Sequence, residues 1–297
     1  MINPSKIAWR EVAWNGIRFD CPVDWEIGEI GLQYLMLETE EGPALELKWN
    51  PVRGRFRHKS QLKRIAAFHR RRLRKTLREE PLPEAWAEAL ADYHTTGFSW
   101  HAESVAGRGV IVYCPQCRNA TLIQFLYRDS DRSGSVSRRL LASFLDHSQN
   151  LTALWAVYDI RAKVPPEFKL QSHRFDAGDF ELAFSNGKQQ LRLHRWSPAS
   201  ILLKGHDLKE IAGARFGISG RQSLSIEMVE TAVAEGHIAP SSIWALWKNR
   251  LQGTPPYRCI RLWHVEEKNR ILCVQIEGKR PIDREAFNRI CLKYESL

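Results

Sequence analysis

Alternating hydrophobic and polar positions predict that the chain is built in two successive rounds of short strands and helices. Three runs in each half have the period-two alternation, or the continuous apolar character, of strands. These runs are residues 16–22, 32–38 and 44–49 in the first half and 155–162, 180–185 and 191–196 in the second. Between the last two runs, Asn186-Gly187 can adopt the positive φ angles of a tight turn, so we expect a hairpin there.

Apolar residues at spacings of three and four then predict helices in both halves. The predicted helices are residues 59–78, 83–93 and 135–147 in the first half and 206–216, 241–251 and 283–294 in the second. Two further strands precede the last helix of each half, at 97–105 and 120–127 and at 257–265 and 270–277. Each half therefore has the order β-β-β-α-α-β-β-α, which predicts an α+β fold with an antiparallel sheet packed with helices.

Four short motifs recur in the same order and indicate a duplication. The pairs are CPVDWEI (21–27) with VPPEFKL (164–170), LELKWNP (45–51) with LRLHRWSP (191–198), LKRIA (62–66) with LKEIA (208–212), and WHAE (100–103) with WHVE (263–266). We expect two domains, residues 1–150 and 151–297, as tandem repeats related by a pseudo-twofold duplication. A residue found in only one copy is then a better functional candidate than one that the fold requires in both.

The start of each repeat, IRFDCPVDWEI in the first, resembles the PsbP-like family. Members of that family often begin with an apolar strand followed by Pro and, three positions later, an aromatic residue; Pro22 and Trp25 match this pattern, and Pro165 and Phe168 repeat it. The resemblance implies an antiparallel α/β sandwich that usually binds a ligand rather than catalyses a reaction. It assigns no functional residue, and this chain departs from many members in being duplicated and in lacking an export signal.

Charge and composition narrow the class of partner. The formal net charge of +10 favours an anionic partner, either nucleic acid or an acidic protein. No apolar run approaches the ~20 residues that span a bilayer, and the N-terminal residues lack a signal-peptide core, so we expect a cytoplasmic protein without a membrane span. Eleven Trp residues predict well-filled cores or faces through which the chain forms an oligomer.

The most basic segment is residues 48–78, which contains thirteen Lys or Arg residues and no acid. The equivalent segment of the second copy mixes signs, because Asp207 and Glu210 lie among its basic residues. We therefore interpret the segment as a docking surface for an anion, with a solvated face, or neutralisation by the acidic segment 78–92, as the alternatives. The candidate binding residues are Arg53, Arg55, Arg57, Lys63, Arg70, Arg71, Arg74, Lys75 and Arg78.

A Cys-x-x-Cys motif, Cys114 and Cys117, interrupts the second strand pair of the first copy, where the second copy has EEKN. This spacing lets both sulfurs bind one metal from a tight turn, so zinc is a possible cofactor; otherwise we expect none. His94, His101 or a symmetry-related residue could complete such a site. A redox dithiol and a hairpin tip without function are the alternatives.

Two further motifs are candidates for function. On a strand, His101 and Glu103 point to the same face, as do His264 and Glu266, and a carboxylate beside an imidazole can raise its basicity for catalysis. Residues 228–251 are loosely similar to a helix-turn-helix, but Ser242 stands where that motif usually has an apolar residue, so we favour two packed helices that bury Trp244 and Trp247.

Common catalytic motifs are absent from the sequence, including a Gly-rich phosphate loop and a G-x-S-x-G elbow. We therefore favour a non-enzymatic binding protein over an enzyme. The alternatives are a zinc-binding or hydrolytic enzyme that uses Cys114 and Cys117 or His101 and Glu103, and a structural subunit of a larger assembly.

Overall fold

The chain divides into two compact units. The first contains residues 1–149 and 156–158, and the second contains residues 150–155 and 159–297. The computed structural model describes residues 7–58, 60, 62–63, 76–101, 105–127, 133–147, 152–216, 226–230, 232–240, 242, 244, 247, 251 and 255–297.

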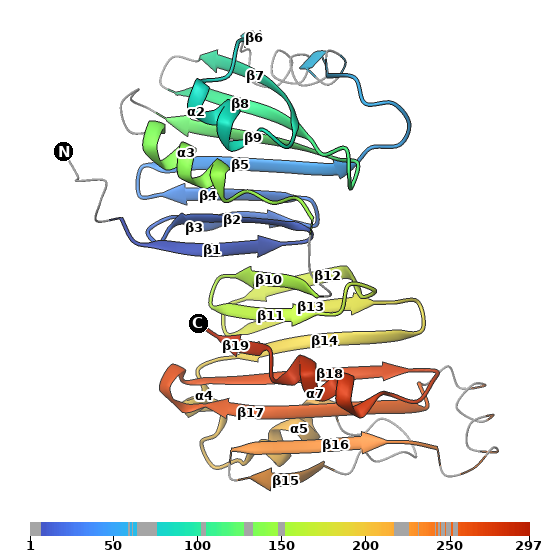
Figure 1. The fold of residues 1–297 in the computed structure, drawn as a ribbon. Coiled ribbons are helices and arrows are strands. Elements are labelled where there is room, and N and C mark those ends of the chain that lie inside the picture. The colour runs from blue at the N-terminus through green and yellow to red at the C-terminus, as the bar shows by residue number, and fades with distance from the viewer. Residues whose placement is uncertain are drawn as a thin grey trace. The chain divides into compact units, whose positions relative to one another are not determined.

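The first unit is built around a seven-stranded antiparallel sheet in the order β3-β4-β5-β9-β8-β7-β6 (Figure 1). A hairpin of β1 and β2 precedes it, and helices α2 and α3 contact each other. The elements are β1 (Trp9–Trp14), β2 (Ile17–Pro22), β3 (Glu26–Gly31), β4 (Tyr34–Thr39), β5 (Gly42–Pro51), β6 (Thr76–Glu79), α2 (Glu84–Ala89), β7 (His94–His101), β8 (Ala106–Tyr113), β9 (Asn119–Tyr127) and α3 (Ser133–Ala142).

The second unit contains a seven-stranded antiparallel sheet in the order β12-β13-β14-β18-β17-β16-β15. Strand β11 pairs with the last strand, β19. The elements are β10 (Ala153–Val157), β11 (Ile160–Val164), β12 (Lys169–Asp176), β13 (Asp179–Ser185), β14 (Gln189–Trp196), α4 (Ala199–Leu202), α5 (Leu208–Phe216), β15 (Ile226–Glu230), β16 (Val233–Ile238), β17 (Tyr257–Val265), the 3-10 helix η2 (Glu266–Lys268), β18 (Arg270–Gly278), α7 (Arg284–Cys291) and β19 (Tyr294–Ser296).

Both seven-stranded sheets have the same topology: three consecutive strands, then the next four in reverse order. The hairpin between β8 and β9 is thus equivalent to the one between β17 and β18, and each ends in a left-handed residue, Arg118 at φ 58° and Asn269 at φ 52°. Three of the repeated motif pairs lie at equivalent places. The fourth does not, because Trp100 and His101 end β7 whereas Trp263 to Val265 end β17, the counterpart of β8.

The expected α+β class is wrong: the fold is mainly β, and its helices are short. The expected order missed strands that depend on tertiary pairing. Residues 76–79 continue the helical spacing of the preceding segment, yet they pair with β7 as strand β6. Residues 155–162 form two strands rather than one, because Tyr158 adopts a φ of 53° and turns the chain. The helix-turn-helix is also wrong, since β15 and β16 pair as an antiparallel hairpin.

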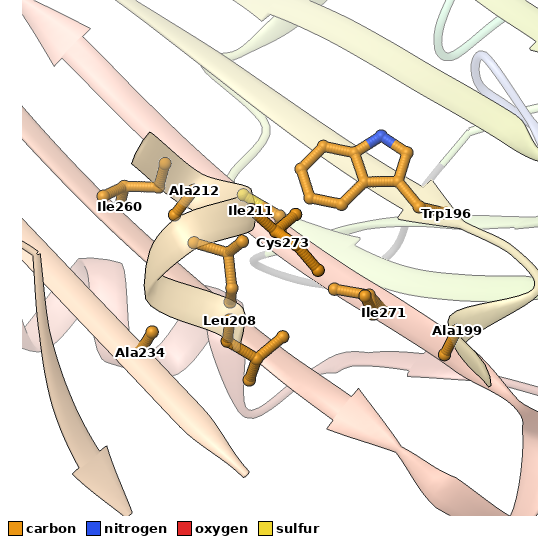
Figure 2. Packing of buried hydrophobic residues seen from close by; sticks show 10 residues of the cluster. Trp196, Ala199, Leu208, Ile211, Ala212, Ala234, Ile260, Ile271 and Cys273 are labelled. Atoms are coloured by element: carbon orange, nitrogen blue, oxygen red, sulfur yellow. The ribbon is translucent and has the colours of Figure 1, made fainter. Parts of the chain in front are cut away.

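Hydrophobic packing between α5 and the sheet forms one core of the second unit. In Figure 2, Leu208, Ile211 and Ala212 lie over the strand residues Ile260 and Cys273. In the first unit Leu62, the equivalent of Leu208 in the LKRIA motif, is buried in a cluster that includes Trp100. Each repeat therefore uses the same leucine to cover its sheet.

Two tryptophans that were expected to be buried are exposed. The side chains of Trp244 and Trp247 are 85% and 60% exposed. Assembly through Trp-rich faces stays a prediction. Among the described residues, no helix is both long and apolar enough to cross a membrane.

Candidate metal centre

The Cys-x-x-Cys motif lies in the tight hairpin that joins β8 to β9. Cys114 donates its backbone N–H to Asn119 over 3.0 Å and accepts a bond from the Arg118 N–H over the same distance. The positive φ of Arg118 closes the turn. As a result Cys114 is buried and Cys117, three residues later, is exposed at the rim of the same turn.

The chain after α3 passes beside this hairpin. Leu145 exchanges two backbone hydrogen bonds of 2.8 Å with Arg18 of β2, which fixes the position of the next two residues. These are Asp146, whose side chain is 1% exposed, and His147, whose side chain is 25% exposed. The hairpin and this segment bring four potential ligands together from positions about thirty residues apart.

The ligand atoms of Cys114, Cys117, Asp146 and His147 all lie within 4.8 Å of one another. The Cys114 sulfur is 3.7 Å from His147 Nδ1, and the Cys117 sulfur is 3.2 Å from Asp146 Oδ2. Around a tetrahedral Zn²⁺ with ordinary bond lengths, a sulfur and a nitrogen ligand would be about 3.6 Å apart. The observed S–N separation matches this value, and the other ligand atoms, all within 4.8 Å of one another, could converge on one zinc ion through side-chain movements of about 1 Å.

The electrostatics of the cluster favour a bound cation. Burial, with a further contribution from Asp146, raises the pKa of the Cys117 thiol to about 12. His147 Nδ1 lies 2.7 Å from Oδ1 of the nearly buried Asp146 carboxylate. A divalent cation would compensate the negative charge that the thiols and the carboxylate carry when ionised.

The donor set selects the metal. Two thiolates and an imidazole are soft or borderline ligands, which suit zinc better than magnesium or calcium. Four protein ligands leave no open coordination position, as in structural zinc sites.

Sequence reasoning identified the two cysteines but not their partners. Residues 135–147 were expected to form one helix, whereas α3 ends at Ala142 and leaves Asp146 and His147 in a bend beyond it. An adjacent Asp and His shortly after a helix was the sequence signal that could have identified these two ligands. His94, an expected ligand, is instead an exposed residue whose ring is 6.1 Å from that of Tyr113.

The two His-Glu motifs do not form equivalent sites in the two units. His101 is exposed at the end of β7, and Glu103 lies outside the described residues. Glu266 lies beyond the end of β17 in η2, so strand alternation does not place it beside His264. The two motifs also lie on non-equivalent strands, which removes the argument that the duplication preserved a catalytic pair.

The start of the basic segment is anchored to the Cys-x-x-Cys hairpin. Val52 donates its N–H to the Arg118 carbonyl, and Arg118 donates from Nη2 to the Gly54 carbonyl, both over 2.8 Å. The Phe56 ring stacks on Tyr113, with centroids 4.3 Å apart and planes inclined by 6°. Phe56 therefore packs against the residue that precedes Cys114, rather than standing free to stack on a base.

The described cations of the basic segment are exposed. They are Lys48, Arg53, Arg55, Arg57, Lys63 and Arg78; Lys48 pairs with Glu46, and none of the other five has an ion pair to an acid of the described chain. Glu80, from the acidic segment expected to neutralise them, instead bonds Arg108 over 2.8 Å and Ser99 over 3.0 Å. The candidates Arg70, Arg71, Arg74 and Lys75 lie outside the described residues.

No protein-family model matches the chain, and no curated protein matches it. A solved structure from Bacteroides thetaiotaomicron VPI-5482, at 1.50 Å resolution, is similar over 50% of this chain and 49% of its own, with 8% identity and a TM-score of 0.28. The chain thus spans about half the length of that structure. A likeness of this size supports no inference about fold or function, so the resemblance to the PsbP-like family stays a prediction.

Proposed function

We propose that the protein binds Zn²⁺ through Cys114, Cys117, Asp146 and His147, as a structural metal in the first unit. The convergence of these four ligand atoms within 4.8 Å is the observation that carries the proposal. The equivalent hairpin of the second unit contains Glu266 and Lys268 instead of cysteines, so the repeated fold does not require the pair.

The ion would connect two segments of the first unit. The hairpin tip carries two ligands, and the chain after α3 carries the other two. Because Val52 and Gly54 are hydrogen-bonded to the same hairpin, zinc would also stiffen the start of the basic segment around Arg53.

The zinc content of the purified protein tests this proposal. We expect about one Zn²⁺ per chain by elemental analysis of protein prepared under reducing conditions, and less than a tenth of that in Cys114→Ser, because a thiolate is a far better zinc ligand than a hydroxyl. Gln116→Ala, an exposed change in the same turn, is the matched control and should keep its zinc. Wild-type protein that stays zinc-free after incubation with ZnSO₄ would disprove the site.

A second function, nucleic-acid binding by the basic segment, is supported by the exposed arginines Arg53, Arg55 and Arg57. Five cations of this segment have no acidic partner in the described chain, which leaves them able to contact phosphates. Residues 52–56 are already held in place by their contacts with the Cys-x-x-Cys hairpin. Their backbone would therefore lose less conformational entropy when the arginine side chains bind a nucleic acid.

Charge reversal tests the second function. We expect Arg53→Glu, Arg55→Glu, Arg57→Glu to weaken binding to labelled single- and double-stranded oligonucleotides, and to reduce the slope of log K against log[salt] by roughly 2 to 3, since each phosphate contact contributes about 0.7–0.9. Fluorescence anisotropy at several salt concentrations measures both. The control reverses Lys188, Lys204 and Lys209, three exposed lysines of the second unit. Equal effects of the two triple variants would show that net charge, and not this segment, causes binding.

A further inference from the structure

A second polar site lies on the α5 face of the sheet in the second unit. A row of paired residues crosses four strands there: Arg174 of β12 faces Glu181 of β13, Glu181 faces His194 of β14, and His194 faces Cys273 of β18. Arg215 and Phe216, the last residues of α5, stand beside this row. Arg174, Glu181, His194, Arg215 and Phe216 line an open cavity of about 300 Å³, the size for a small ligand.

The lining of this cavity is predominantly cationic. Arg174, Arg192 and Arg215 line it against a single acid, Glu181. Arg192 pairs with Glu277 at 2.7 Å, and both Arg174 and Arg215 reach Asp179 at 3.2 Å, which fixes the guanidinium groups in place. Each guanidinium has five N–H donors, so these pairs leave donors for a further acceptor.

His194 adds a buried polar group without a partner. The residue is 5% exposed, and its Nε2 atom has no hydrogen-bond partner. Its Nδ1 atom lies 3.5 Å from Glu181 Oε2. A buried imidazole nitrogen without a partner costs free energy, and a bound oxygen ligand would satisfy it.

The surroundings of His194 oppose protonation of its ring. Burial is the largest cause that lowers its pKa, to about 4, with Arg192, Arg215 and Arg174 acting in the same direction and Asp179 against them. Glu181 and the buried Cys273 thiol are the other titratable groups that face the ring. Arg174, Arg192 and Arg215 thus contribute a positive potential at the ring that favours an anion, and Asp179 opposes it.

The first unit does not preserve this chemistry. By strand register, Glu46 and Lys48 of β5 occupy the places of Arg192 and His194, and Gln124 of β9 that of Gln275. Lys48 pairs with Glu46 at 2.5 Å and lies 5.0 Å from the Tyr34 ring centroid. The sheet therefore tolerates a self-neutralised arrangement here, and the arginines of the second unit are not a requirement of the fold.

We propose that the cavity lined by Arg174, Arg192, His194 and Arg215 binds a phosphate dianion, either free or as the terminal group of a small phosphomonoester. Several guanidinium groups on different elements match the several oxygens of a phosphate. The bound dianion favours the protonated imidazole, in which His194 Nε2 donates one more hydrogen bond while Nδ1 faces Glu181, and Phe216 supplies an apolar wall for the organic part.

Titration with inorganic phosphate, phenyl phosphate and succinate at constant ionic strength tests this site. We expect both phosphates to bind by isothermal titration calorimetry more tightly than succinate, and the variant Arg174→Gln, Arg215→Gln to bind at least tenfold more weakly, since a charge-assisted bond contributes more than a tenfold factor. Tighter binding of phenyl phosphate would identify a phosphomonoester as the ligand class. Equal or tighter binding of free phosphate would identify the inorganic ion.

The control variant is Arg289→Gln, an exposed arginine of α7 in the same unit, which should bind as wild type does. A second readout uses the wild-type protein alone: the imidazole resonances of His194 should shift on phosphate addition, and its pKa should rise because the bound dianion favours the protonated ring. No heat and no resonance shift at 10 mM phosphate, or an equal loss of affinity in Arg289→Gln, would overturn the proposal.

Discussion

Removal of zinc with a chelator is expected to lower the midpoint of thermal unfolding by about 5–10 °C. Saturation at a hundredfold excess over the dissociation constant stabilises a protein by about 2.7 kcal/mol, and 1 kcal/mol shifts the midpoint by about 2–4 °C for a unit of this size. The loss should be local to the first unit, because all four ligands, Cys114, Cys117, Asp146 and His147, belong to it. Hydrogen exchange should then show lower protection in β8, β9 and the chain after α3, with the strands of the second unit unchanged.

Two variants make this result specific. Cys114→Ser should already unfold at the lower temperature and should not respond to the chelator, whereas Gln116→Ala should behave as wild type. A wild-type protein with bound zinc whose unfolding midpoint does not change on chelation would contradict a structural role for the ion.

Substitution of Asp159 by Ala is expected to destabilise the second unit by about 2–4 kcal/mol. Asp159 accepts hydrogen bonds from Arg195 and from Arg270, each with an Nε to carboxylate oxygen distance of 3.0 Å. The Arg195 side chain is only 8% exposed and lies over the Phe180 ring, so removal of the carboxylate leaves a buried cation without its counter-ion. Such losses cost about 3–5 kcal/mol when fully buried, and less here because Asp159 keeps 24% exposure.

Urea unfolding followed by circular dichroism measures this change. Glu295→Ala, which removes the exposed partner of Arg161 at 3.7 Å, is the matched control and should cost less than about 1 kcal/mol. The double variant Asp159→Ala, Arg195→Met should recover part of the lost stability, because the buried charge is gone. A loss below about 1 kcal/mol for Asp159→Ala would show that the arginines do not depend on this carboxylate.

Local patterns predicted many strands correctly, and the reason is physical. Strand β14 alternates buried and partly exposed positions over Leu191 to Leu193, and Gly187 adopts the positive φ, 81°, that the preceding hairpin turn requires. These features act over two to four residues, so a sequence window contains all of their determinants. The helix α5 was also predicted within two residues of its observed bounds.

The sheets as a whole could not be predicted in this way. Strand β6 continues a helical spacing but is fixed by pairing with β7, and β15 is fixed by pairing with β16. In both cases backbone hydrogen bonds to a partner strand override the local preference. The number of strands, and with it the mainly β class, depends on these partners.

The candidate sites also contain some features that the sequence predicts and others that only the folded structure creates. The sequence by itself predicted the duplication and determined the concentration of cations before β6 and the pair Cys114 and Cys117, because each is a matter of order and spacing along the chain. Only the tertiary structure brought Asp146 and His147 to those cysteines, and Arg174 and Arg215 to His194. The positions of the ligand atoms depend on which distant segments lie at the same edge or on the same face of a sheet. Strand pairing decides which segments these are, and strand pairing is a long-range property of the folded chain.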